Sequence, residues 1–187
     1  MKIFLGFKGP RKKILGSQMA GVIESVGKNV KLFKNGDQVY GANGFRASCY
    51  AQYVCMSEKR VLTMKPNNMT YQEASPVPFG GMTALELLRK GNIQSGQKVL
   101  IYGASGAVGT YAVQLAKYFG AEVTGVCSST NFELVKSLGS SDVIDYTKEN
   151  FTENGKLYDV IFDAVGKIKS SSSKKSLKQG GVYISVK

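Results

Sequence analysis

The spacing of hydrophobic residues changes near residue 70 and divides the chain into two parts. Before Pro66, short apolar segments alternate with glycine-containing turns, a pattern typical of a β-rich barrel or sandwich. From Tyr71 onward, apolar residues recur at helical spacing and then in short continuous runs. We therefore expect a β-rich domain over residues 1–70 and an α/β domain over residues 71–187.

The same pattern predicts individual elements. In the first part the candidate strands lie at residues 20–26, 36–41, 50–55 and 61–64. Thr70 and Glu73 have the spacing of a helix capping box, Pro76 and Pro78 are expected to end that short helix, and an amphipathic helix is predicted over 82–90. In the second part the candidate strands lie at residues 99–102, 121–127, 143–146, 158–163 and 181–186. Strands that alternate with helical segments predict a doubly wound parallel sheet.

The turn after the strand 99–102 suggests a ligand. It consists of Ala104, Ser105, Gly106, Ala107, Val108 and Gly109 and leads into a helix. Gly106 would let the backbone approach a diphosphate, Gly109 would let the helix pack closely on the strand, and the first-turn N–H groups would face the anion. Ala104 stands where the strict dinucleotide fingerprint has its first glycine. A turn that only connects two elements is the alternative, and the strand that follows the helix weighs against it by completing a βαβ unit.

The end of that second strand bears on which dinucleotide is bound. An Asp or Glu at this point accepts hydrogen bonds from the ribose of NAD. Here the residues are Cys127, Ser128, Ser129 and Thr130. The sequence therefore favours NADP(H), whose 2′-phosphate could accept hydrogen bonds from Ser128 and Ser129. Capping of the next helix, predicted over 131–138, is a compatible alternative role for these hydroxyl groups.

Composition and charge add fewer constraints. The chain has 187 residues, a formal net charge of +12 and no apolar run of the roughly 20 residues that a membrane span needs. The lysines between Lys167 and Lys178 are not interleaved with stacking aromatic residues, so we expect a solvated basic face rather than a nucleic-acid site. Three scattered cysteines favour free thiols in a reducing compartment, and we expect a cytoplasmic protein without a membrane partner.

Several segments together resemble the medium-chain dehydrogenase/reductase superfamily, in its zinc-free quinone-reductase (zeta-crystallin-like) branch. The resemblance covers nearly the whole chain and rests on residues 15–27, 33–41, 81–84, 104–109 and 163–166. It implies a partial GroES-like β-rich domain followed by a Rossmann domain, with NADP(H) in the cleft between them. Members of this family extend beyond both ends of the matched region, so we expect the chain to lack both ends of the full-length protein, which would form a homodimer.

The resemblance also implies roles for individual residues. Thr83 would lie near the nicotinamide, while Ser105 to Val108 would hold the diphosphate. Ser128, Ser129 and Tyr146 would surround the 2′-phosphate, and Val165 and Gly166 would border the cofactor. Asn131 stands where relatives can place a lysine for that phosphate, which weakens the preference for NADPH.

Candidate catalytic residues are fewer. Tyr40 and Asn43 come at the rim expected to face the substrate, where a phenol or an amide could polarise a carbonyl oxygen. Packing at the end of a strand is an equally weighted alternative for both.

Metal chemistry is not expected, because zinc-dependent members carry Gly-His-Glu where this chain has Gly16-Ser17-Gln18, and the sequence has no histidine. The predicted function is zinc-independent, NADPH-dependent hydride transfer to a quinone or α,β-unsaturated carbonyl compound. The alternatives are a cofactor-binding but inactive chain and, with less support, a basic nucleic-acid-binding protein.

Overall fold

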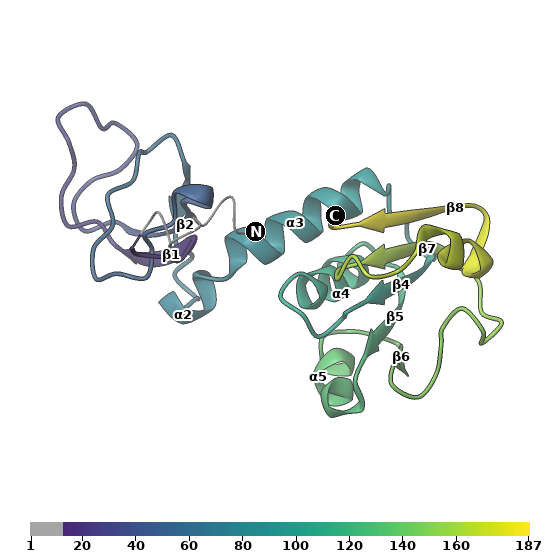
Figure 1. Ribbon diagram of the computed structural model, residues 1–187. Helices are drawn as coiled ribbons and strands as arrows, with labels where there is room; N and C mark the ends of the chain where they lie inside the picture. Colours follow the sequence, from purple (N-terminus) through teal and green to yellow (C-terminus); the bar gives the residue numbers. More distant parts are fainter. Residues whose placement is uncertain (1–12) are drawn as a thin grey trace. The chain divides into compact units, whose positions relative to one another are not determined.

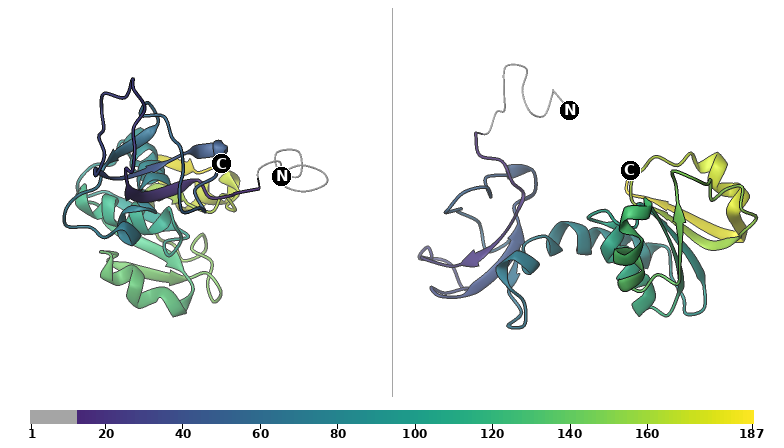
Figure 2. Two further views of the ribbon diagram at one scale, coloured as in Figure 1. Left: turned by 90° about the vertical axis from the view of Figure 1, so that its left-hand side faces the viewer. Right: turned by 90° about the horizontal axis from the view of Figure 1, so that it is seen from below.

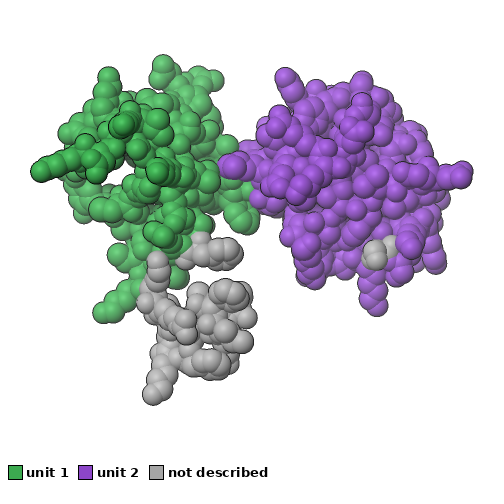
Figure 3. All heavy atoms as spheres, turned by 90° about the horizontal axis from the view of Figure 1, so that it is seen from above, with its two compact units in different colours: residues 1–79 green, residues 80–187 purple. Residues whose placement is uncertain are grey.

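The computed structural model of the chain describes residues 13–187. Its contacts divide the chain into two compact units, residues 1–79 and 80–187 (Figure 3). The division falls within one helix, α3 (Val77–Lys90). Residue 70, where the sequence predicts a domain boundary, is the N-cap of the preceding helix, α2 (Tyr71–Ala74). Residues 1–12 of the predicted first domain lie outside the described part.

The first unit contains an antiparallel sheet of three strands. These are β1 (Gln18–Val22), β2 (Gln38–Ala42) and β3 (Val61–Met64), with β2 in the middle (Figure 1). Ala20 and Thr63 flank Tyr40 from the two neighbouring strands. A short turn of 3-10 helix, η1 (Gly44–Arg46), follows β2.

The strand predicted at residues 50–55 is wrong. These residues form bends and irregular backbone, and the side chains of Tyr50 and Tyr53 are 78% and 70% exposed. Strand β2 is already paired along both edges, with β1 and β3. Among the described residues, the Tyr50 N–H donates to the Leu15 carbonyl, but residues 51–55 make no backbone hydrogen bond of a strand ladder. Apolar alternation by itself does not supply a ladder.

The helices near the boundary confirm one prediction and correct another. The Thr70 hydroxyl accepts a hydrogen bond from the Glu73 N–H at 3.2 Å, and the Glu73 carboxylate accepts one from the Thr70 N–H at 2.8 Å, so the capping box is present. Helix α3 starts at Val77, five residues before its predicted start. Pro78 lies in its first turn, where a missing N–H costs no intrahelical hydrogen bond, so this proline does not break the helix.

The second unit contains a parallel sheet of five strands, and all five were predicted. The strands are β4 (Lys98–Tyr102), β5 (Glu122–Cys127), β6 (Asp142–Asp145), β7 (Tyr158–Asp163) and β8 (Leu177–Ser185). Their order is β6-β5-β4-β7-β8, the doubly wound order, with β6 and β8 at the edges (Figures 1 and 2). The remaining elements are α4 (Gly109–Tyr118), η2 (Ser129–Asn131), α5 (Phe132–Ser137), α6 (Ser170–Ser173) and η3 (Lys174–Ser176).

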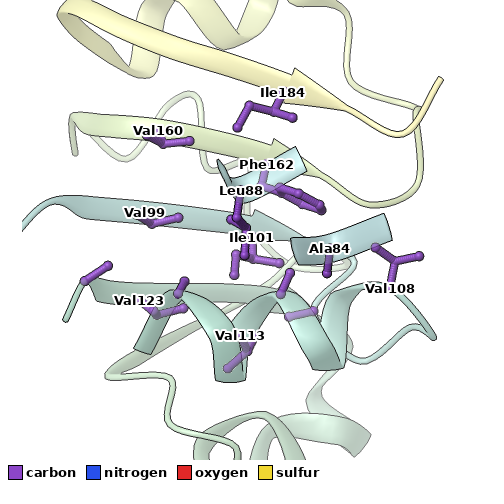
Figure 4. Packing of buried hydrophobic residues seen from close by; sticks show 14 of the residues in the cluster. Ala84, Leu88, Val99, Ile101, Val108, Val113, Val123, Val160, Phe162 and Ile184 are labelled. Atoms are coloured by element: carbon purple, nitrogen blue, oxygen red, sulfur yellow. The ribbon is translucent and has the colours of Figure 1, made fainter. Parts of the chain in front are cut away.

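Alternate residues of the central strands pack into two hydrophobic cores, one on each face of the sheet. Val99 and Ile101 of β4 lie in the larger core, together with Leu88 of α3, Val113 of α4 and Phe162 of β7 (Figure 4). The residue between them, Leu100, belongs to a smaller core on the other face of the sheet, together with residues Val126, Ile144, Phe151, Tyr158 and Ile161. Burial on both faces explains why these strands read as continuous apolar runs. Because these strands pair in parallel, the carboxyl ends of β4, β5, β6 and β7 lie at the same end of the sheet, where the predicted cofactor residues follow.

Candidate functional site

The turn between β4 and α4 is held over the neighbouring strand. Gly103 and Ala104 each donate a backbone hydrogen bond of 3.0 Å to the Val126 carbonyl of β5, and the Gly106 N–H donates one of 2.9 Å to the Gly103 carbonyl. Gly103 has a φ of +78°, a conformation that favours glycine. The fingerprint spacing did not predict a role for Gly103. The feature of the sequence that could have indicated it is a glycine directly after a buried strand.

Close approach of backbone explains the residue types in this turn. A Cβ atom at Gly109 would come within 2.0 Å of the Gly103 carbonyl oxygen, so α4 can start here only with glycine. Ala104 is completely buried, and its methyl group packs over Gly125 of β5, where a Cβ would lie 3.1 Å away. The alanine at the first fingerprint position thus fills a small space in the core without opening the turn.

Open hydrogen-bond donors make the turn suited to an anion. Among the described residues, the N–H groups of Ala107, Val108 and Gly109 have no acceptor. They begin a helix of 10 residues with no acidic side chain in its first turn, and the partial positive charge of a helix N-terminus favours an anion at this position. The turn therefore fits the diphosphate of a dinucleotide.

The residues predicted to surround a 2′-phosphate meet at the edge formed by β5 and β6. Cys127 and Asp145 are paired at the ends of these strands, and the Tyr146 N–H donates a hydrogen bond of 3.3 Å to the Cys127 carbonyl. Ser129 and Tyr146 lie in the two loops that follow these strands, and both are exposed, Tyr146 to 56%. Ser128 occupies the N-cap position of η2 without a side-chain capping bond, so its hydroxyl is not used as a helix cap.

Asp145 adds a carboxylate that the sequence argument did not place at this edge. It is 4% exposed, and its Oδ1 accepts hydrogen bonds from the Thr147 N–H at 2.9 Å and from the Thr147 hydroxyl at 2.7 Å. These bonds, with further contributions from Ser129 and Lys148, hold the pKa of Asp145 below its ordinary value. The end of β5 carries no acid, as predicted, but the end of β6 does.

Asp163 orders the loop that carries Val165 and Gly166. Its side chain is completely buried at the end of β7. Oδ1 accepts hydrogen bonds from the N–H groups of Val165 and Gly166 at 2.9 and 2.8 Å, and Oδ2 accepts one from the Ile168 N–H at 2.9 Å. The loop also closes on the glycine turn, because a Cβ at Gly103 would lie 2.4 Å from the Val165 side chain. The predicted cofactor residues on β4 and β7 are thus neighbours.

The other predicted site residues lie on separate elements. Thr83 is half-buried on α3, one residue before the buried Ala84. Tyr40 is half-buried in β2, and within the described chain its hydroxyl has no hydrogen-bond partner. Asn43 is 6% exposed, and its amide donates a hydrogen bond of 2.8 Å to the Ala47 carbonyl across η1. That bond supports the packing alternative for Asn43.

The described residues also bear on metal binding, disulfide formation and membrane insertion. No group of three or more Cys, Asp or Glu residues in this part could hold a metal ion. Cys49, Cys55 and Cys127 have free thiols, as predicted. No helix between residues 13 and 187 has both the length and the apolar character needed to span a bilayer.

Comparison with known proteins identifies the family. Residues 2–67 match the alcohol dehydrogenase GroES-like domain, and residues 107–186 match the zinc-binding dehydrogenase family. The chain belongs to the medium-chain dehydrogenase/reductase superfamily. The predicted fold class, a GroES-like part followed by a Rossmann domain, is confirmed by these matches. The family matched by residues 107–186 is named for zinc binding, and the zinc independence of this chain stays a prediction.

Individual relatives of the chain are named as reductases or oxidoreductases. It is 39% identical over 190 residues to a 2-methylene-furan-3-one reductase of Solanum lycopersicum, covering 97% of the chain and 48% of that protein. A chloroplastic NADPH-dependent alkenal/one oxidoreductase of Arabidopsis thaliana is 34% identical, with 98% and 49% covered. The structure of the quinone oxidoreductase from Coxiella burnetii matches with a TM-score of 0.83 and 33% identity, over 90% of the chain and 54% of that structure. The chain spans about half the length of the curated relatives it matches.

Proposed function

We propose that this chain carries the cofactor-binding part of a zinc-independent, NADPH-dependent oxidoreductase that reduces a quinone or an α,β-unsaturated carbonyl compound. The observation that carries the proposal is the β4–α4 turn, with its obligatory Gly109 and three N–H groups that have no acceptor among residues 13–187. The names of the relatives, an NADPH-dependent alkenal/one oxidoreductase and a quinone oxidoreductase, support this choice of cofactor and substrate class.

NADP(H) is proposed over NAD(H) because β5 ends in Cys127 and is followed by hydroxyl groups rather than a carboxylate. Ser128 and Ser129 donate to the 2′-phosphate, and the exposed Tyr146 ring lies at the same edge. Asp145, the carboxylate at the end of β6, has one oxygen engaged by Thr147 and is buried, so it does not present itself to a ribose as an NAD-specific acid would.

The predicted cofactor residues then have roles in binding or in orientation. Ala107, Val108 and Gly109 donate backbone N–H groups to the diphosphate, beside Ser105 of the same turn. Gly106, whose own N–H is bonded to the Gly103 carbonyl, lets the backbone come close to the diphosphate. Val165 and Gly166, held by Asp163, border the cofactor, and Thr83 lies toward its nicotinamide end. When bound, the reduced nicotinamide supplies the hydride, so the protein needs to orient the two reactants and exclude water rather than provide a nucleophile.

Of the two proposed catalytic residues, Tyr40 is the better supported. In the part of the chain that the structure describes, its phenol makes no hydrogen bond, so it can donate one to the substrate oxygen as negative charge develops there. The amide of Asn43 is engaged by Ala47. Zinc is not needed for this chemistry, and without histidine the chain offers only thiolates and carboxylates as strong ligands.

The remaining partners and the compartment are proposed on weaker grounds. A small carbonyl or quinone compound is the substrate, the full-length form is a homodimer, and no nucleic-acid or membrane partner is invoked. The free thiols support a cytoplasmic location, whereas relatives are named as chloroplastic or mitochondrial.

Steady-state turnover tests the proposal. Purified protein is mixed with NADPH and either a benzoquinone or a short enone, with and without a metal chelator, and loss of nicotinamide absorbance is followed. We expect oxidation of NADPH that depends on the acceptor and does not change with the chelator. Inhibition by the chelator would contradict zinc independence. NADPH binding without turnover would replace the proposed activity by the binding-only alternative.

A further inference from the structure

We propose that Lys148 is the cationic residue that binds the 2′-phosphate of NADPH, and that Asp145 is the positioning residue that holds it there. Asn131, at the position where a lysine could serve this purpose, is neutral, and its amide donates to the Ser128 hydroxyl at 3.2 Å. The inference rests on the proposed function, because it assumes that an NADP(H) phosphate lies at the edge formed by β5 and β6.

The backbone brings Lys148 to this edge. Strands β5 and β6 are parallel and end together at the pair Cys127 and Asp145. The hydrogen bond from the Tyr146 N–H to the Cys127 carbonyl continues their contact by one residue. The segments 128–130 and 146–148 therefore leave the sheet side by side, one with the hydroxyl groups and the other with the lysine.

The Asp145 carboxylate connects the two segments. Thr147 occupies its Oδ1, while Oδ2 is buried and has no hydrogen-bond partner among the described residues. The Lys148 Nζ lies 3.9 Å from that Oδ2, at the outer limit of an ion pair. The Ser129 hydroxyl is also close enough to Asp145 to contribute to lowering the pKa of the carboxyl group. Ser129 and Lys148 thus share one buried anchor.

Charge explains why a cation is needed at this point. Two like charges about 4 Å apart repel each other, and they do so more strongly near a protein surface than in bulk water. A phosphate placed over Ser129 would meet the negative charge of Asp145 unless Lys148 balanced it. An ammonium group has three donors, so Lys148 can contact Asp145 and a phosphate oxygen together. Its side chain is 73% exposed and has the freedom to move toward the ligand.

The surroundings have room and the right sign for an anion. A cavity of about 640 Å³ opens beside this edge and includes Tyr146 and Lys148 in its wall. Its charged lining consists of the lysines Lys148, Lys167 and Lys169 and the glutamates Glu149 and Glu153. Of these three lysines, Lys148 is the one that forms an ion pair with Asp145, at the ends of β5 and β6 where Ser129 also lies.

Cofactor titration of charge variants tests the assignment. NADPH and NADH are titrated separately into the unmodified chain, Lys148→Gln, Lys148→Arg and the control Lys136→Gln. Lys136 lies near the end of α5 with a side chain 52% exposed. Lys136→Gln removes one positive charge, as Lys148→Gln does, and is therefore a control for the change in net charge. We expect Lys148→Gln to weaken NADPH binding about tenfold and to leave NADH binding within about twofold, since only NADPH carries the phosphate. Lys148→Arg and Lys136→Gln should bind both cofactors as the unmodified chain does.

The outcomes separate this inference from the proposed function. If the unmodified chain prefers NADPH and Lys148→Gln keeps the full preference, Lys148 does not bind the phosphate, although NADP(H) remains the cofactor. Equal weakening of both cofactors by Lys148→Gln would also overturn the assignment. If the unmodified chain shows no preference for NADPH, the proposed cofactor and the role of Lys148 both fail. Lys148 is exposed, so thermal unfolding should show all the variants folded.

Discussion

Two carboxylates, Asp145 and Asp163, hold the loops on which the predicted cofactor residues lie. Both come at the ends of strands and are almost completely buried. The sequence predicted Ser128, Ser129 and Gly166 as site residues from spacing and resemblance, and the structure brings Ser128 and Ser129 beside Tyr146. It did not predict the supporting roles of the carboxylates, because an Asp at a strand end reads the same whether it accepts loop N–H groups or faces solvent.

Replacing Asp163 with alanine should destabilise the second unit. The variant leaves three backbone N–H groups without their acceptor and removes one of the two acceptors of the Tyr183 hydroxyl, which keeps the Ile168 carbonyl. Burial and the neighbouring Asp163 carboxylate raise the pKa of Tyr183, so the phenol stays protonated as a donor. We expect the free energy of unfolding to fall by about 3 kcal/mol, as measured by urea denaturation. The control is Glu86→Ala, which removes only an exposed ion pair with Lys90 and should cost less than about 0.5 kcal/mol. Equal losses for the two variants would rule out the proposed role of Asp163.

At the scale of elements, the sequence was most informative where burial dictates the residue types. The central strands β4, β5 and β7 were predicted because strands covered on both faces need continuous apolar runs. The edge strands β6 and β8 were also predicted, although β8 begins at Leu177, before its predicted start at residue 181. The segment 50–55 was assigned wrongly because its alternation carries no information on whether a partner edge is free. The early start of α3 was missed because a proline breaks a helix in the interior but is tolerated in the first turn, where Pro78 lies.

The β4–turn–α4 element predicts a sharp response to one methyl group. In Gly109→Ala the new Cβ would meet the backbone of Gly103 and Ala104, which cannot move without displacing the turn from β5. We expect the free energy of unfolding to fall by about 1–3 kcal/mol and NADPH binding to weaken at least about tenfold. Gly27→Ala is the matched control, since a Cβ there meets no atom within 4 Å. Wild-type affinity in Gly109→Ala would show that the turn does not hold the diphosphate.

For the molecule as a whole, pattern and motif order together were sufficient to predict the fold class and the superfamily. Parallel strands joined by helices allow few topologies, and the doubly wound order is one of them. The identity of the substrate is a different matter. Pocket walls in such enzymes are formed by side chains from many loops, and the chain spans about half the length of the relatives it matches. Tyr40 was predicted from its place at the rim expected to face the substrate, but no pattern in the sequence specifies the molecule it would contact.

Direct binding of the two reduced cofactors tests most simply whether this chain is an NADP(H)-binding protein. Calorimetric titration of the unmodified chain with NADPH and then with NADH compares two ligands that differ only in the 2′-phosphate. Hydroxyl groups after β5 and the lysine after β6 predict that NADPH binds at one site and at least about tenfold more tightly than NADH. Binding of NADH as tight as that of NADPH, or no binding of either, would contradict the assignment of this edge of the sheet to the 2′-phosphate.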